Sequence, residues 1–331
     1  MGMLGALDRY QRKHKWLGLP LAVVYKFADD QGAYLAALIT YYGFLSLFPL
    51  LLIMATVLGF VLPGHPELQQ QLIDSALAQF PIIGDQLTSG TQPLRGSGWG
   101  LVTGIVVALY GGLNAAVAIQ NALDIVWGVP VNKRPNPFLA RLRSLAMLGL
   151  LGAGVLLTTA LTVVGGFGER FGPVVRVGVV VLSVAVNCGL YIVAFRALTV
   201  RAVTVREVVP GALLAAVGWQ VLQAVGTAYV DGQLRGSTQV YGLFAIVLGL
   251  LAWIYLAAVV VVLSAELNAV VAGRLWPRAL LGPFIEDVDL TRADRRSYTS
   301  YATSQRYRES EEIEVSFRGP DDPPEGRDRD G

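Results

Sequence analysis

The chain is poor in charge. Asp, Glu, Lys and Arg make up 15% of its 331 residues, against about 25% in a typical soluble domain. A helix needs about 20 apolar residues to cross a hydrocarbon core of about 30 Å. Six stretches of at least 19 residues carry no charge at all: 31–66, 96–123, 144–168, 177–195, 208–230 and 236–265. This absence excludes an ordinary soluble fold and predicts an all-α, polytopic membrane protein.

Cysteine and histidine are equally scarce. One cysteine, Cys188, and two histidines, His14 and His65, supply neither a disulfide nor a cluster with metal-ligand spacing. A Gly-rich phosphate loop followed by Lys-Ser/Thr is absent, and so is a G-x-S-x-G motif. We therefore expect no catalytic residues, no metal, no cofactor and no enzymatic activity.

The charge-free stretches divide the chain into three parts. Residues 1–32 form a basic arm without a cleavable signal peptide, because the first long apolar run is too long for one. Residues 274–331 form a tail that we expect to be largely disordered from about residue 290, since its polar, charge-mixed sequence has little apolar surface to bury. Between them, residues 33–273 hold six expected spans, at about 33–62, 99–127, 144–166, 174–197, 207–230 and 238–272.

Basic residues predict the orientation, because Lys and Arg in short loops stay in the cytoplasm. Four lie in the alternate loops: Arg95, Arg170, Arg176 and Arg235. Twelve lie before span 1 or in the loops after spans 2 and 4: Arg9, Arg12, Lys13, Lys15, Lys26, Lys133, Arg134, Arg141, Arg143, Arg196, Arg201 and Arg206. With six spans, this bias places both termini in the cytoplasm.

One amphipathic segment lies between spans 1 and 2. Residues 67–80 (ELQQQLIDSALAQF) place their apolar side chains on one helical face. We expect an external amphipathic helix on the membrane surface; an ordinary loop helix packed on the bundle is the alternative. Span 5 has a helix start signal at Thr204-Val205-Arg206-Glu207, which fits a capping box.

Polar side chains inside the spans form a candidate polar pocket. Within each span they recur at spacings that place them on one helical face. Asp124 and Glu266 lie near the cytoplasmic ends of spans 2 and 6, so they would border one pocket if their faces meet. The candidate residues are Tyr42, Ser46, Asn114, Asn121, Asp124, Gln220, Gln223, Tyr241, Tyr255 and Glu266.

Packing is the alternative interpretation of these side chains. Amides and tyrosines can hydrogen-bond across helices for about 1 kcal/mol each without any transport role. The acids are functional candidates because a charge inside a membrane is costly. They could instead pair with basic loop residues, such as Arg274 for Glu266 or Lys133 for Asp124. Both interpretations stay open.

Several motifs together resemble the BrkB/YihY family. They are residues 36–50 (AALITYYGFLSLFPL), 121–127 (NALDIVW), 210–212 (PGA) with Trp219, Tyr241-Gly242, 251–255 (LAWIY) and 264–269 (SAELNA). The family usually has glycine where this chain has Ser264, a small departure. The resemblance covers roughly residues 25–275.

The resemblance implies a six-span inner-membrane protein linked to envelope integrity, with lipopolysaccharide-precursor transport connected to one branch and serum resistance proposed for another. We therefore expect a transporter or flippase-like protein for an envelope lipid or amphipathic precursor. A non-transporting scaffold for envelope assembly is the alternative. The family's older label, ribonuclease BN, is disfavoured because metal-assisted hydrolysis needs clustered ligands. Expected partners are membrane lipid and an amphipathic or lipid-linked substrate, with no nucleic acid; a homo-oligomer stays open.

Overall fold

The computed structural model describes residues 2–61, 98–136, 138–145, 173–229, 235–280 and 290–317, together with residues 67, 70, 149 and 154. Within these residues every regular element is helical and no strand is present. The elements are α1 (Gly2–Lys13), α2 (Lys15–Asp29), α3 (Gly32–Val61), α6 (Gly98–Val126), the 3₁₀ turn η1 (Val131–Lys133), α8 (Pro173–Leu198), α9 (Val205–Tyr229), α10 (Arg235–Gly273) and α11 (Arg292–Ser304). Residues 138–145 are also helical.

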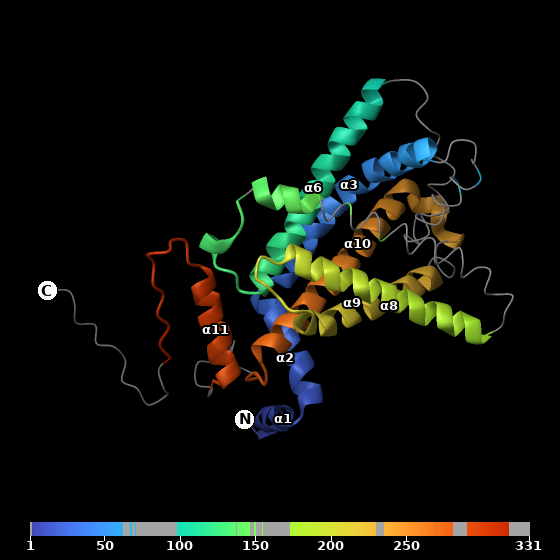
Figure 1. The fold of residues 1–331 in the computed structure, drawn as a ribbon. Helices are drawn as coiled ribbons and strands as arrows, with labels where there is room; N and C mark the ends of the chain where they lie inside the picture. Colours follow the sequence, from blue (N-terminus) through green and yellow to red (C-terminus); the bar gives the residue numbers. More distant parts are fainter. Residues whose placement is uncertain are drawn as a thin grey trace.

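The long helix α10 lies at the centre of the bundle. It packs against α9, α3 and α2, while α3 pairs with α6 and α8 pairs with α9. Figure 1 shows α1 and α11 at the same end of this bundle. An even number of membrane crossings would place them on one side.

Small residues set the closest helix contacts. A Cβ atom added to Gly111 of α6 would lie 3.0 Å from backbone and side-chain atoms of Ser46 on α3. The absence of a side chain at Gly111 therefore lets these two helices approach each other closely, as is common between membrane helices.

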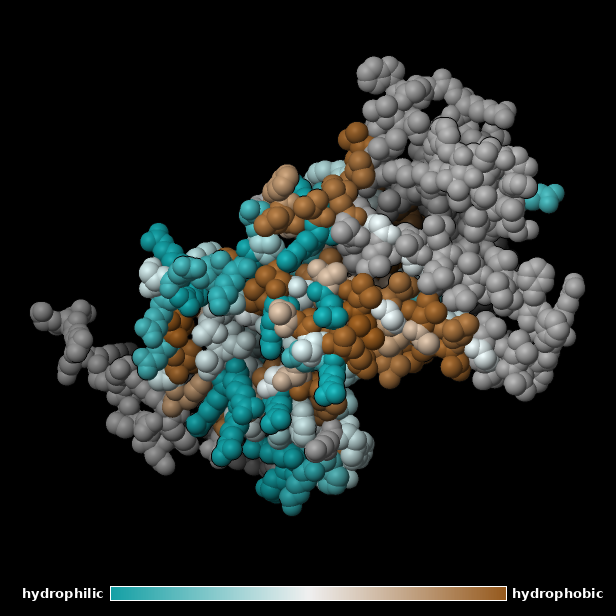
Figure 2. Space-filling view, viewed as in Figure 1, coloured by the Kyte–Doolittle hydropathy of each residue, from teal (hydrophilic) through white to brown (hydrophobic). Residues whose placement is uncertain are grey.

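The flanks of the bundle expose apolar side chains. A soluble monomer rarely exposes a large contiguous apolar patch, whereas a lipid-facing helix must. Figure 2 shows hydrophobic residues over the flank formed by α8 and α9, and hydrophilic residues gathered at the end that carries α1 and α11. Exposed large apolar residues on these two helices include Val181, Leu182, Val193, Leu213, Leu214, Val217, Val221 and Val225.

The expected spans largely coincide with helices. Spans 1, 2, 4, 5 and 6 match α3, α6, α8, α9 and α10 to within about three residues. Among the described residues, three stretches are long and apolar enough to cross a membrane: Val181–Leu198, Val205–Gly226 and Val247–Gly273. Most of the expected third span, 144–166, and most of the amphipathic segment 67–80 lie outside the described residues. The six-span count and the external helix therefore stay predictions.

The tail differs from expectation. Disorder from about residue 290 is wrong for Arg292–Ser304, which form α11. Thr291 caps this helix: its side chain accepts a hydrogen bond from the Asp294 amide, and the Asp294 side chain accepts one from the Thr291 amide. The segment has little apolar surface, but buried polar and charged side chains hold it in place. The amino-terminal arm likewise folds, into α1 and α2.

Candidate functional site

A buried group of three charges joins α2 to α10. The Lys26 Nζ atom lies 2.5 Å from Asp30 Oδ2 and 3.2 Å from Glu266 Oε2. The side chains of Lys26, Asp30 and Glu266 are 5%, 2% and 0% exposed. Buried charges are costly unless they are paired, and here one cation serves two carboxylates. The trio carries a formal net charge of −1.

Burial and pairing shift the pKa values of Lys26 on α2 and of Asp30, which caps the end of α2. Burial disfavours the charge on Lys26, but Glu266 and Asp30 favour it more strongly, so the pKa of Lys26 is raised. Burial raises the pKa of Asp30, and the nearby Lys26 ammonium offsets this only in part. Lys26 therefore supplies the positive charge that stabilises the ionised form of both carboxylates.

A second cluster surrounds Arg278, just after α10. Its side chain is 1% exposed, and its Nε donates to Asp294 Oδ1 at 2.5 Å. Its Nη2 donates to Asp29 Oδ2 at 3.1 Å and its Nη1 to Ser297 Oγ at 3.1 Å. Arg278 thus connects α2 to α11. Burial opposes its charge, but the carboxylates outweigh burial and raise the pKa of Arg278.

Tyr301 of α11 connects the two clusters. Its hydroxyl donates to Asp29 Oδ2 at 3.2 Å, and its ring centre lies 5.7 Å from Lys26 Nζ. Burial and the neighbouring carboxylates of Asp30 and Asp29 raise the pKa of the Tyr301 phenol. We call the connected set the charge network: Lys26, Asp29, Asp30, Glu266, Arg278, Asp294 and Tyr301.

Backbone groups after α10 are also held by the amino-terminal helices. The Gln11 Nε2 atom donates to the Arg278 carbonyl at 2.6 Å. The Asp8 carboxylate accepts from the Leu280 amide at 3.1 Å, and the Tyr25 hydroxyl donates to the Leu280 carbonyl. The chain segments that precede α3 and follow α10 are therefore held together by these contacts.

The other predicted acid, Asp124, lies in different surroundings. It is 3% exposed, and its Oδ1 accepts from the Val200 amide, in the loop after α8, at 3.4 Å. Nearby, Asn121 Oδ1 accepts from Arg134 Nη1 at 3.1 Å. The structure therefore does not bring Asp124 together with Glu266. The basic partner of Glu266 is Lys26, not Arg274.

The remaining predicted pocket residues are distributed over helix contacts. Asn114 donates to the Tyr110 carbonyl on its own helix, and Ser46 donates to Gly43 and faces Gly111. Tyr42 and Tyr255 pack, half-buried, on one core cluster formed by α3, α6 and α10. Gln220 and Gln223 are half-buried on α9, whereas the side chain of Tyr241 lies outside the described residues.

Two of the family-like motifs, residues 210–212 and 264–269, meet where α9 packs against α10. The Gly211 amide donates to Asn268 Oδ1 at 2.6 Å. A Cβ atom at Gly211 would lie 2.0 Å from the Ser264 carbonyl oxygen. The glycine is thus required by the close approach of the two helices.

Sequence reasoning did not identify most of the charge network. Lys26 and Asp30 are four residues apart, the spacing of a helical ion pair, and this local signal was available. Thr291 and Asp294 fit the capping pattern that was used for span 5. In span 5 this pattern predicted the start of α9 correctly. Thr204 directly precedes the helix, and its amide donates a hydrogen bond to the Glu207 carboxylate. The contacts of Glu266 and Arg278 across the fold leave no local sequence signal.

A family model described as "Virulence factor BrkB" matches residues 23–281, which include α3, α6, α8, α9 and α10. The chain belongs to the BrkB family. The sequence resemblance is thereby confirmed, and both motif regions at the α9–α10 contact fall inside the matched range. Of the charge network, Lys26, Asp29, Asp30, Glu266 and Arg278 are inside it, whereas Asp294 and Tyr301 lie beyond it.

Curated relatives of this BrkB-family chain include proteins named as membrane proteins and one with a ribonuclease-like name. It is 28% identical over 255 residues to "Inner membrane protein YhjD" of Escherichia coli, covering 70% of this chain and 74% of the relative. It is 27% identical to "Putative ribonuclease-like protein YfkH" of Bacillus subtilis, covering 75% and 93%. A "UPF0761 membrane protein" of Chromohalobacter salexigens is 26% identical, covering 77% and 64%. No solved structure matches the chain.

Proposed function

We propose that this inner-membrane protein of the BrkB family is a transporter or flippase-like protein for an envelope lipid or amphipathic precursor. The observation that carries the proposal is the Lys26–Glu266 pair. The Glu266 carboxylate is fully buried and lies within Val247–Gly273, the most apolar of the candidate spans among the described residues. Such a residue is costly in a membrane helix and marks substrate or ion pathways by default.

The pair offers a simple switch. In the proposed cycle, an anionic group of the substrate competes with Glu266 for Lys26. Because Lys26 is the contact through which α2 holds Glu266 on α10, the exchange would loosen α2 from α10. Glu266 would have to take up a proton as it leaves Lys26, because an isolated buried carboxylate is very costly.

Complementation tests this proposal. Lipid profiling of a deletion strain would first identify the envelope lipid that accumulates. Glu266→Gln should express and fold but fail to restore the lipid profile, whereas the exposed tail variant Arg308→Gln should restore it. Purified protein in liposomes should then move the fluorescently labelled form of that lipid between leaflets. Full rescue of the lipid profile by Glu266→Gln would contradict the transport proposal. The same holds if the labelled lipid moves between leaflets no faster than in liposomes without protein.

A membrane scaffold is the second candidate. It is favoured by the predicted pocket residues that serve structural contacts: Ser46 packs against Gly111, and Asn121 accepts a hydrogen bond from Arg134 in the loop after α6. A scaffold would require the folded bundle but not the charge on Glu266. Rescue by Glu266→Gln together with loss of rescue by a packing variant such as Gly111→Leu would indicate this role.

We propose that both termini lie in the cytoplasm. The excess of Lys and Arg before and between spans supports this, and so does the shared end of α1 and α11 (Figure 1). Reporter fusions after residue 90 and near residue 234 should read as external. Fusions near residues 136 and 203 and in the tail should read as cytoplasmic, and an external tail would contradict the six-span assignment.

We propose no nuclease activity, although one relative has a ribonuclease-like name. Among the described residues, no three His, Cys, Asp or Glu side chains are grouped so as to hold a metal ion. Purified protein incubated with precursor tRNA and divalent metals should leave the RNA intact. Cleavage that copurifies with the chain would overturn this expectation.

A further inference from the structure

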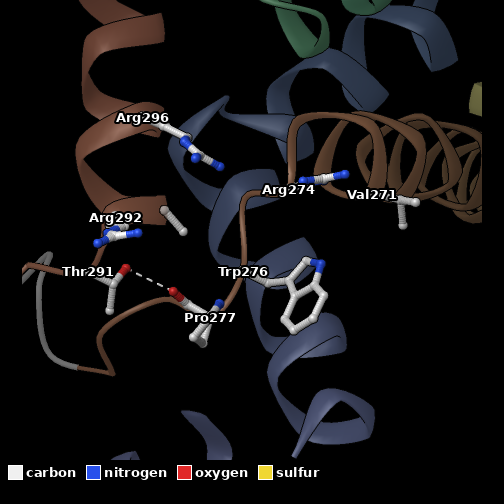
Figure 3. A pocket seen from close by; sticks show the side chains of 8 residues that line it. Val271, Arg274, Trp276, Pro277, Thr291, Arg292 and Arg296 are labelled. Carbon is white, nitrogen blue, oxygen red and sulfur yellow. Dashed lines mark hydrogen bonds between the residues drawn. The ribbon is translucent and has the colours of Figure 1, made fainter. Parts of the chain in front are cut away.

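A basic pocket lies where α10 ends and α11 begins. It has a volume of about 610 Å³. Three arginines line it: Arg274 at the end of α10, and Arg292 and Arg296 on α11. Figure 3 shows Arg292 and Arg296 of α11 on one side of the pocket, and Arg274, Trp276 and Val271 on the other. The pocket is separate from the charge network, although both use α11.

The arginines of this pocket are available to a ligand. Arg274, Arg292 and Arg296 are exposed, and within the described residues none of them forms an ion pair. The acid nearest to them in sequence, Asp294, is 1% exposed and is directed inward to Arg278 and to the amides of Ala279 and Thr291. It therefore does not neutralise the pocket. An anion with several oxygen acceptors complements three guanidinium groups.

The position of the pocket favours a lipid over a free ion. Val271 belongs to the apolar stretch Val247–Gly273, so the pocket lies at the level where that helix leaves the hydrocarbon. Trp276 adds an aromatic ring of the kind found at headgroup level. An apolar wall beside three arginines suits a phosphate that is attached to acyl chains. Basic pockets at this depth bind anionic headgroups in other membrane proteins.

We propose that Arg274, Arg292 and Arg296 bind the phosphate of an anionic glycerophospholipid in the leaflet next to α1 and α11. This inference is independent of transport, because a scaffold could bind the same lipid. Binding would also join the end of α10 to α11, since each supplies at least one arginine. The lipid would therefore stabilise the docked position of α11.

The test compares lipids that differ in headgroup charge. Purified full-length protein in a neutral detergent is titrated with phosphatidylglycerol or with phosphatidylcholine of the same acyl chains, and bound lipid is counted by native mass spectrometry. We expect preferential binding of phosphatidylglycerol. Arg274→Gln and Arg296→Gln should each weaken that binding roughly fivefold, and together about 25-fold. Equal binding of the two lipids would overturn the proposal.

Matched variants separate the pocket from general surface charge. Arg308→Gln removes the same charge from an exposed tail position outside the pocket and should leave phosphatidylglycerol binding unchanged. Arg274→Lys with Arg296→Lys should retain most of the preference, which guards against loss through misfolding. A loss of affinity in Arg308→Gln as large as in Arg296→Gln would contradict a defined site. Binding of inorganic phosphate with no phosphatidylglycerol binding would assign the pocket to a free anion and overturn the lipid assignment.

Discussion

Lys26 of α2 and Glu266 of α10 form an ion pair of 3.2 Å between residues 240 positions apart in the chain. The pair attaches the segment before the first expected span to the last helix of the bundle. Asp30 shares the same ammonium group at 2.5 Å. The two carboxylates therefore depend on one cation, and the three charges are not equivalent in their contribution to stability.

This imbalance predicts losses of stability of very different size for two neutralising substitutions. Lys26→Met would leave two buried carboxylates without a cation and should cost about 3–5 kcal/mol of stability. Glu266→Gln leaves Lys26 and Asp30 as a matched pair and should cost only about 1 kcal/mol. Thermal unfolding of the purified variants in one detergent would measure both. Equal losses in the two variants would show that the trio does not share a single cation.

The tail supplies a second prediction. A chain that ends at residue 290 lacks α11, so Arg278 loses Asp294 and Ser297, and its melting temperature should fall clearly. A chain that ends at residue 318 keeps α11 and should melt like the full chain. Asp294→Asn should reproduce much of the loss, about 3–5 kcal/mol, because it removes one side of a buried ion pair. An unchanged melting temperature in the shorter chain would show that α11 does not stabilise the bundle.

Alkaline pH should destabilise the protein through Lys26 and Tyr301. Folding raises the pKa of both groups, whose unfolded values are about 10.4 and 10. Below about pH 10 both stay protonated in either state, so the stabilisation is complete there. Above this pH the unfolded chain releases these protons first, and stability falls as pH rises.

The corresponding measurement is the melting temperature from pH 8 to pH 11. Tyr301→Phe removes one of the two titrating groups, so its melting temperature should fall less steeply above about pH 10. Tyr307→Phe, at a position 66% exposed, should follow the parent chain. A Tyr301→Phe curve parallel to the parent would contradict the role assigned to this phenol.

The helices could be predicted from sequence because their signal is local. The charge-free run 96–123 predicted a span at about 99–127, and α6 covers Gly98–Val126, because the length of an apolar segment decides whether it can cross a membrane. The ends of the chain could not be predicted in the same way. α11 docks through Arg278, Asp294 and Ser297 rather than through apolar residues, so a search for apolar periodicity finds nothing in it. Glu266 was identified as costly, but its partner Lys26 depends on a tertiary contact.

The final prediction compares a glycine at a close helix contact, Gly211, with a glycine that has open space around it, Gly189. Gly211 of α9 faces α10 so closely that an added Cβ would lie 2.0 Å from the Ser264 carbonyl oxygen and 2.5 Å from Asn268 Nδ2. The carbonyl is backbone and cannot move aside alone, so Gly211→Ala should force the helices apart. It should also break the hydrogen bond from the Gly211 amide to Asn268 Oδ1, at 2.6 Å. We expect a loss of at least about 3 kcal/mol or failure to fold, as in an overpacked core.

Gly189 of α8 is the matched control, because an added Cβ there would meet no atom within 4 Å among the described residues. Gly189→Ala should be neutral or stabilise the helix by up to about 1 kcal/mol, since alanine is the better helix former. Both variants add a single methyl group to a long apolar helix, so their difference isolates the helix contact. Yield and melting temperature after purification in the same detergent would compare them. If Gly211→Ala melts like Gly189→Ala, then α9 and α10 do not approach each other through Gly211 in the membrane.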